Sequence, residues 1–199
     1  MSYPDTIENL IDCFKKYPGV GARSAERFAL ATLSLDNELI DVFAKSLTDS
    51  KAKIKRCERC NYYTEDDLCK ICSDKTRNKD IICLVEDPKN VKMLEDTHIF
   101  DGYYYVLNGL ISPINGIEPN DLNIEKLLSI IDKDNIKEVI IAVKPSIEGE
   151  TTSLYISKLL EDKNIIVSRI AQGVPMGADI DYVDSLTLEL ALENRKKMC

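Results

Sequence analysis

Four cysteines constrain the fold of this chain more than any other feature of its sequence. They form two C-x-x-C pairs, separated by eight residues, at Cys57, Cys60, Cys69 and Cys72. Each pair lets a tight turn aim two thiolates at one ion, and two such pairs complete the tetrahedral shell that structural zinc prefers. We therefore predict a zinc knuckle, in which the bound metal supplies folding free energy and has no open position for a reacting water.

The alternatives are two disulfide bonds or four unrelated cysteines. Disulfides need a secretory context, and the amino terminus has no basic region followed by an apolar stretch, as a signal peptide would. No apolar run approaches the length that spans a membrane. We therefore expect a cytoplasmic protein without membrane contact, in which Cys13 and Cys83 are buried and Cys199 is an exposed thiol of the tail.

The formal net charge of −8 is distributed unevenly along the chain. Residues 1–79 hold 14 Lys and Arg against 13 Asp and Glu, whereas residues 80–199 hold 12 against 21. Because salt screens exposed charges over about 10 Å, a phosphate backbone responds to the nearest surface rather than to a distant acidic part. The overall acidity therefore does not exclude DNA as a partner.

The segment before the cysteines is predicted to be helical. Apolar residues at helical spacing mark one face of a first helix, and they are Ile7, Leu10, Ile11 and Phe14. A second helix is expected just beyond Gly21. The intervening Tyr-Pro-Gly19-Val-Gly21 hairpin, with a small residue four places later at Ala25, resembles a helix-hairpin-helix motif. The alternative is that this turn merely connects two structural helices.

The hairpin has the chemistry of a phosphate-binding site. Its two glycines permit positive φ and close approach, and the backbone N–H groups of the hairpin and the next helix point to solvent. Such groups bind phosphate oxygens, and neighbouring cations add charge without reading base edges. We expect DNA contacts from Lys15, Lys16, Gly19, Gly21, Arg23 and Arg27.

A third helix is predicted before the cysteines. Its apolar residues at helical spacing are Leu39, Val42, Phe43 and Leu47, and a basic run over residues 51–56 follows as a solvated face. Three short helices cannot bury much core alone. We expect the second and third helices to pack against another copy of the chain.

Strands and helices alternate from residue 80 onward. The predicted strands are 81–85, 103–107, 139–143 and 165–170, and the predicted helices open at Asp87-Pro88 and cover 122–131 and 152–160. Strict alternation favours an α/β fold with a doubly wound parallel sheet, whose ligands lie beyond the carboxyl ends of the strands. A Gly-rich segment, 172–182, is interpreted as a structural loop rather than a nucleotide site, and a terminal helix follows around Leu186–Leu192.

Two polar clusters follow strands of this sheet. Glu86 comes directly after the first strand, and residues 144–150 come after the strand that ends at Val143. This pairing resembles the Toprim domain, in which an acidic residue and a later D-x-D hold magnesium for phosphoryl transfer. Aligned on the Gly-Glu pair at 149–150, the two aspartate positions are Lys144 and Ser146.

The resemblance therefore implies a Toprim scaffold without its catalytic metal site. Magnesium recruits carboxylate oxygens, and an ammonium at one of those positions removes a ligand and adds repulsion. The sequence also lacks a phosphate-binding P-loop, so we assign no catalytic residue. Glu86, Glu148 and Glu150 remain as an acidic surface for a partner, and the alternative is that they are ordinary solvated carboxylates on loops.

The order of these parts resembles that of the RecR family of recombination mediators. The predicted parts are a helix-hairpin-helix region (1–56), a four-cysteine zinc finger (57–72), a Toprim domain (80–175) and a carboxyl-terminal segment (176–199). The likeness extends to specific stretches at 85–88, 110–117 and 145–150. One departure is Lys144, where the family usually has Asn.

This resemblance implies a non-enzymatic role in recombinational DNA repair. Members of the family assemble as ring-shaped tetramers that can encircle DNA, join RecO and RecF, and help to load RecA onto DNA coated by single-strand-binding protein. On that basis the hairpin would face the DNA, and Glu86, Glu148 and Glu150 would face RecO. The alternative function is a magnesium-dependent Toprim nuclease or primase-like enzyme.

Overall fold

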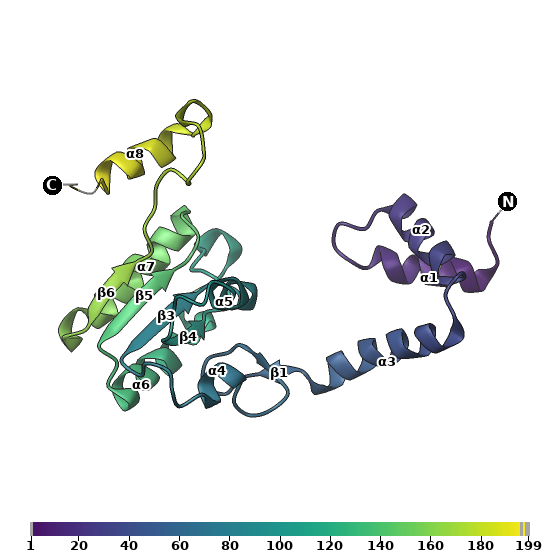
Figure 1. Ribbon diagram of the computed structural model, residues 1–199, viewed down its shortest axis with the longest axis horizontal. Coiled ribbons are helices and arrows are strands. Elements are labelled where there is room, and N and C mark those ends of the chain that lie inside the picture. The colour runs from purple at the N-terminus through teal and green to yellow at the C-terminus, as the bar shows by residue number, and fades with distance from the viewer. Residues whose placement is uncertain (1, 196, 198–199) are drawn as a thin grey trace. The chain divides into compact units, whose positions relative to one another are not determined.

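The computed structural model describes residues 2–195 and 197, so the predicted tail thiol of Cys199 lies outside the described residues. The chain divides into two compact units, residues 1–54 and residues 55–199, and each is described by itself (Figure 1). None of the helices in the described part of the chain has the length and apolar character needed to span a bilayer.

The first unit consists of three helices, α1 (Asp5–Lys15), α2 (Ala22–Thr32) and α3 (Asn37–Lys53). The predicted apolar face of α1 packs on α2, and the small side chains of Ala25 and Ala29 let the two helices approach closely. Val20 packs against the same cluster from the hairpin. The ring of Phe14 meets that of Phe28 edge-on, with the centroids 5.7 Å apart.

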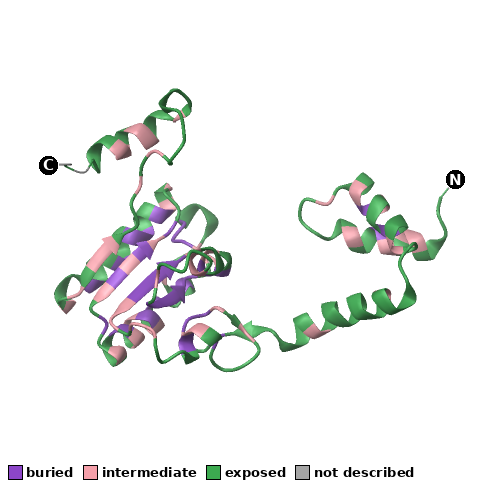
Figure 2. Ribbon diagram, viewed as in Figure 1, coloured by how far each residue is buried: buried purple, intermediate pink, exposed green. Residues whose placement is uncertain are grey.

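The third helix of this unit is mostly exposed, and only Ile40 and Asp49 have intermediate exposure. None of its described residues is buried (Figure 2). The apolar residues predicted from helical spacing are exposed on it; Val42, for example, is 61% exposed. We define the apolar stripe of α3 as Leu39, Val42, Phe43 and Leu47.

The second unit contains a short hairpin and a four-stranded sheet. The hairpin pairs β1 (Lys55–Arg56) with β2 (Tyr63–Thr64) and is followed by α4 (Lys70–Ser73). The sheet is entirely parallel, in the order β4-β3-β5-β6. Its strands are β3 (Ile81–Val85), β4 (Tyr103–Val106), β5 (Glu138–Ala142) and β6 (Ile166–Arg169). The predicted α/β fold with a parallel sheet is confirmed.

Helices cover both faces of this sheet. Alternate residues of β3 point to opposite faces: Leu84 packs with α6 (Ile124–Asp134) and α7 (Ile147–Leu160), and Val85 packs with α5 (Pro88–Glu95). Strand β3 and the edge strand β4 are buried on both faces, whereas only alternate residues of β5 are buried (Figure 2). Short 3-10 turns lie at Pro113–Asn115, Pro119–Leu122, Glu161–Lys163 and Ile180–Tyr182.

Two details differ from the sequence-based expectations. Helix α7 begins at Ile147 rather than near residue 152, because the Ser146 side chain caps it and its polar first turn carries no apolar pattern. Cys13 is exposed, since it lies on α1 outside the apolar face, whereas Cys83 is buried as predicted. The terminal helix α8 spans Ser185–Glu193, as expected after an irregular Gly-containing segment.

Candidate functional site

The four cysteines of the predicted knuckle converge on one point. Their Sγ atoms all lie within 4.8 Å of one another, and all four residues are buried. Zinc–sulfur bonds of about 2.3 Å in a tetrahedron put the sulfur atoms about 3.8 Å apart. The Sγ atoms of Cys60 and Cys69 are 3.5 Å apart, and the four cysteines are free thiols, so the cluster fits zinc and excludes the disulfide alternative.

Backbone turns place the thiols. The N–H of Cys57 donates to the carbonyl of Tyr62 at 2.7 Å, and the N–H of Asn61 donates to the carbonyl of Cys57 at 3.0 Å. Asn61 has φ +61°, a left-handed conformation that asparagine tolerates better than most residues. The N–H of Cys69 donates to Sγ of Cys57 at 3.3 Å, so the second C-x-x-C pair is tied to the first.

The electrostatics of the cluster call for a cation. Hydrogen bonds with the Cys60 and Cys69 thiols lower the pKa of Cys57, whereas contacts with Cys57 and Cys60 raise the pKa of Cys72. Four thiols this close cannot all ionise by themselves, and a divalent ion supplies the charge that keeps thiolates deprotonated. With four sulfur ligands the shell is closed, so the site can hold structure but has no position for a substrate.

The knuckle is attached to the edge of the parallel sheet, which the sequence did not reveal. The N–H of Val106, at the end of β4, donates to the carbonyl of Cys60 at 2.8 Å, and the Asn61 amide donates to the carbonyl of Val106 at 3.1 Å. Arg59 forms an ion pair with Asp134 of α6 at 2.8 Å. The metal site and the sheet therefore share backbone and side-chain hydrogen bonds, although 45 to 75 residues separate the partners.

The hairpin between α1 and α2 has one glycine in a left-handed conformation. Gly19 has φ +79°, whereas Gly21 is extended with φ −80°, so only the first needs the positive φ expected of both. A Cβ built on either glycine meets no described atom within 4 Å, so packing within this chain does not require glycine at 21. That open backbone leaves room for a group from outside the chain.

Unpaired hydrogen-bond donors surround this hairpin. The backbone N–H groups of Gly19 and Gly21 donate to no described residue, and no described side chain caps the amino terminus of α2. The first turn of α2 carries no acidic residue. Uncapped N–H groups at the positive end of a helix dipole form a site for an anion.

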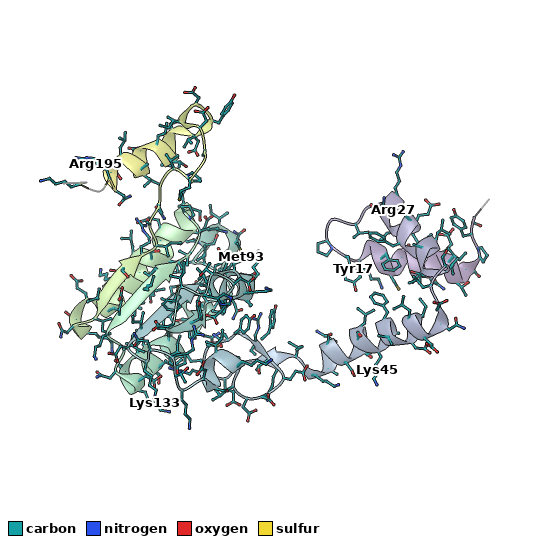
Figure 3. The ribbon with its side chains drawn as sticks, viewed as in Figure 1. Tyr17, Arg27, Lys45, Met93, Lys133 and Arg195 are labelled. Carbon is teal, nitrogen blue, oxygen red and sulfur yellow. The ribbon has the colours of Figure 1, made fainter. Side chains whose placement is uncertain are left out.

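The four predicted cations flank the hairpin in the sequence. Arg23 and Arg27 are exposed and, within the described residues, form no ion pair; Figure 3 shows Arg27 extending away from α2. Lys16 is also exposed and without an acidic partner among those residues, whereas Lys15 pairs with Asp12 at 3.0 Å. Lys15 is therefore the weakest of the four predicted cations, because part of its charge is already balanced.

One aromatic residue at the hairpin was not assigned from the sequence. Tyr17 follows Lys16, the C-cap residue of α1, and is 52% exposed. It is labelled in Figure 3. A half-exposed ring that follows Lys16 in the chain offers a surface on which a base can stack. Its position in the hairpin, next to Pro18, was the available signal.

The predicted acidic residues lie together at the carboxyl ends of β3 and β5. We call this surface the strand-end rim and define it by Glu86, Lys144, Ser146, Glu148 and Glu150. Glu86 follows β3, and Glu148 and Glu150 lie in the first turn of α7 rather than in a loop. Acidic side chains in a first helical turn are stabilised by the helix dipole.

Ion pairs neutralise much of this rim. Nζ of Lys144 lies 3.2 Å from Oε1 of Glu86, and Arg169 of β6 pairs with Glu150. Glu148 forms no ion pair with a described residue; its own backbone N–H and the Ser146 hydroxyl lower its pKa. Of the three carboxylates expected to form an acidic surface, Glu86 and Glu150 are held in ion pairs, and Glu148 has none among the described residues.

An apolar groove adjoins the rim. It has a volume of about 550 Å³ and lies between the first turn of α7 and helix α8. Its apolar lining comes from Pro145, Ile147, Leu186 and Leu190. The rim thus offers a partner apolar surface as well as charge.

Comparison with known protein families accounts for nearly the whole chain. Residues 7–51 match the family described as RecR, helix-hairpin-helix, and residues 54–74 match the four-cysteine zinc finger domain of RecR. Residues 80–171 match Toprim domain, and residues 173–196 match RecR, C-terminal.

The chain is thus a zinc-finger protein that combines a DNA-binding type of helical hairpin with a Toprim domain. With all four parts matched in order, it belongs to the RecR family. This membership gives it a role in DNA recombination and repair. The prediction of zinc as the cofactor is confirmed by the match to the RecR zinc finger together with the four buried cysteines.

Proposed function

We propose that this protein is a non-enzymatic DNA clamp and recombination mediator, which acts with RecO and RecF to load RecA onto DNA coated by single-strand-binding protein. The observation that carries the DNA-binding part is the hairpin of the first unit. The N–H groups of Gly19 and Gly21 have no acceptor among the described residues, and Arg23 and Arg27, which follow in α2, form no ion pair with those residues. We assign residues 1–56 to DNA binding and assembly, 57–72 to zinc, 80–175 to the Toprim scaffold and 176–199 to a carboxyl-terminal segment.

The hairpin would bind the DNA backbone rather than base edges. Backbone N–H groups and the positive end of α2 recognise phosphate oxygens in any sequence. Arg23 and Arg27 lie one helical turn apart and would release counterions on contact, which makes the affinity depend on salt. Lys16 and, more weakly, Lys15 would contribute in the same way.

A clamp requires several copies of the chain. The apolar stripe of α3 supports this part of the proposal, because a row of exposed large apolar side chains is typical of a surface that another chain covers. A closed ring follows when the contact repeats with rotational symmetry. We propose a ring of four copies with the hairpins facing the enclosed DNA.

The strand-end rim is the surface we propose for RecO. Glu148, with no ion pair among the described residues, would meet a cation of the partner, and the neighbouring groove would receive an apolar side chain. Glu86 and Glu150 would exchange their internal partners for those of RecO. Such charge pairs steer association and fix register more than they add affinity.

The rival function, a magnesium-dependent nuclease or primase-like enzyme, needs metal ligands at the rim. Ser146 caps α7 and Lys144 pairs with Glu86, so the geometry favours docking over catalysis. Incubation of the zinc-loaded protein with DNA or RNA and magnesium separates the two functions. Cleavage that disappears in Glu86→Gln would establish the enzyme instead.

Reversal of the two arginines tests the DNA proposal. Arg23→Glu with Arg27→Glu should weaken binding to all DNA sequences alike, and the log–log salt dependence should flatten by about one unit per lost contact. The matched control is Lys133→Glu with Lys158→Glu, which changes the net charge equally on α6 and α7. Equal weakening by both pairs would show that net charge, and not the hairpin, governs binding.

Reversal of two rim carboxylates tests partner docking. Glu86→Lys with Glu148→Lys should abolish capture of RecO and leave DNA binding and oligomerisation intact. Capture by the wild-type protein should weaken as salt rises. Undiminished capture by the double variant would contradict the assignment of the rim.

A further inference from the structure

The strand-end rim includes a positively charged side chain, that of Lys144. In the register of the sheet, Val85 of β3 pairs with Ala142 of β5. Glu86 and Lys144 therefore follow neighbouring strands at the carboxyl end of the sheet. The ammonium of Lys144 lies 3.2 Å from Oε1 of Glu86. Glu86 is 27% exposed and Lys144 is 55% exposed, so the pair lies at the surface with the carboxylate as its more covered member.

The backbone beside Lys144 is held in place by α7. The carbonyl of Lys144 accepts a hydrogen bond from the N–H of Ser146 at 3.0 Å. A Cβ on Gly149 would lie 2.0 Å from the same carbonyl oxygen, so only glycine allows the helix to approach this closely. The Ser146 hydroxyl in turn accepts from the N–H of Gly149 at 3.2 Å. The lysine therefore emerges from a fixed position next to Glu86.

A magnesium ion does not fit these residues. Mg²⁺ binds carboxylate oxygens in a strict octahedral geometry, whereas Glu86, Lys144 and Ser146 offer one paired carboxylate, an ammonium and a hydroxyl that caps a helix. The ammonium already supplies the positive charge that a metal would bring. We propose that Lys144 is a resident counter-ion, which takes the place of a divalent cation beside Glu86 and closes the rim to Mg²⁺ and Mn²⁺.

This inference rests on the non-catalytic role proposed above and extends it. A tethered cation keeps the charge of the rim the same at any concentration of free magnesium, so partner docking at this surface is independent of divalent metal. The reverse also follows: replacement of the lysine by a carboxylate should open a divalent site, because two carboxylates would then project from adjacent strand ends.

Titration with Mn²⁺ followed by electron paramagnetic resonance tests the inference on the zinc-loaded protein. Mn²⁺ prefers oxygen ligands, so it does not compete for the thiolate cluster. The wild-type protein and the cation-retaining control Lys144→Arg should show no binding that depends on Glu86. Lys144→Asp should bind about one Mn²⁺ per chain, and Lys144→Asp with Glu86→Gln should lose it.

A second, milder variant keeps the test decisive if Lys144→Asp does not fold. Lys144→Asn removes the ammonium and supplies an amide oxygen, so MgCl₂ should raise its unfolding temperature and leave that of the wild type unchanged. Wild-type binding of Mn²⁺ that disappears in Glu86→Gln would overturn the inference. The absence of a metal effect in both Lys144→Asp and Lys144→Asn would also overturn it. DNA cleavage would instead overturn the proposed function, so the two failures are distinguishable.

Discussion

Residues 55–199 cover most of their large apolar side chains themselves, whereas residues 1–54 leave a continuous stripe uncovered. The parallel sheet buries long side chains such as Leu84, Leu127 and Ile156 between strands and helices. The helical unit buries only Ile11, Ala25 and Ala29 fully among its described residues. The difference supports our proposal that the first unit is completed by contacts with another copy of the chain, whereas the second has a core of its own.

The two units also differ in how their helices begin. In the second unit Asp87, Ser146 and Asp184 cap α5, α7 and α8 through side-chain hydrogen bonds, whereas α4 and α6 have no such cap among the described residues. Helices α1, α2 and α3 have no such cap from any described residue. The uncapped donors of α2 are available to bind phosphate.

The largest expected effect comes from the metal. Cys60→Ser should release zinc and destabilise the second unit by more than about 4 kcal/mol, because zinc binding is folding free energy and the knuckle shares hydrogen bonds with β4. The measurements are zinc release with a colorimetric chelator and urea unfolding. Cys13→Ser, on an exposed thiol outside the cluster, is the control and should change neither. A zinc-free variant that kept the wild-type unfolding curve would refute the structural role.

Truncation of the core should have the next largest effect. Leu127 on α6 is fully buried in the sheet unit, and Leu127→Ala should cost about 3 kcal/mol from lost burial and the cavity that remains. Lys126 of the same helix donates a hydrogen bond to Oδ1 of Asn61 in the knuckle. The exposed Lys133→Ala is therefore the better control and should cost less than about 0.5 kcal/mol. Equal costs for the two variants would contradict the assignment of the core.

Helix capping should give the smallest effect. Ser146→Ala removes the hydroxyl that accepts from the N–H of Gly149 and should cost about 1 kcal/mol in urea unfolding. Asp36 holds the matching N-cap position on α3 without a side-chain hydrogen bond, so Asp36→Ala should change stability by less than about 0.5 kcal/mol. The contrast between the units fails if Asp36→Ala proves the more costly change.

Local patterns were enough to predict most of the fold. The strand at 81–85 reads as a buried apolar run, and α1 shows the helical spacing of Ile7, Leu10 and Ile11. The zinc cluster was predictable because its four ligands lie within 16 residues and two tight turns. These features depend on interactions between near neighbours in sequence.

Contacts between distant residues could not be predicted in this way. The Lys144–Glu86 pair joins two strand ends, and Arg59 reaches Asp134 from the knuckle. Helix α7 begins early because Ser146 caps a first turn that has no apolar periodicity. In the two ion pairs the partner is set by the packing of the sheet, which a one-dimensional pattern does not contain. The start of α7 is a local feature that apolar periodicity does not mark.

The mass of the native protein tests the clamp most directly. Native mass spectrometry at micromolar concentration should give about four times the chain mass of 22.5 kDa for the wild type. Val42→Glu with Phe43→Glu, on the apolar stripe of α3, should reduce the mass of the assembly and leave the circular dichroism spectrum unchanged. A wild-type protein that remained a single chain while binding DNA would contradict the ring.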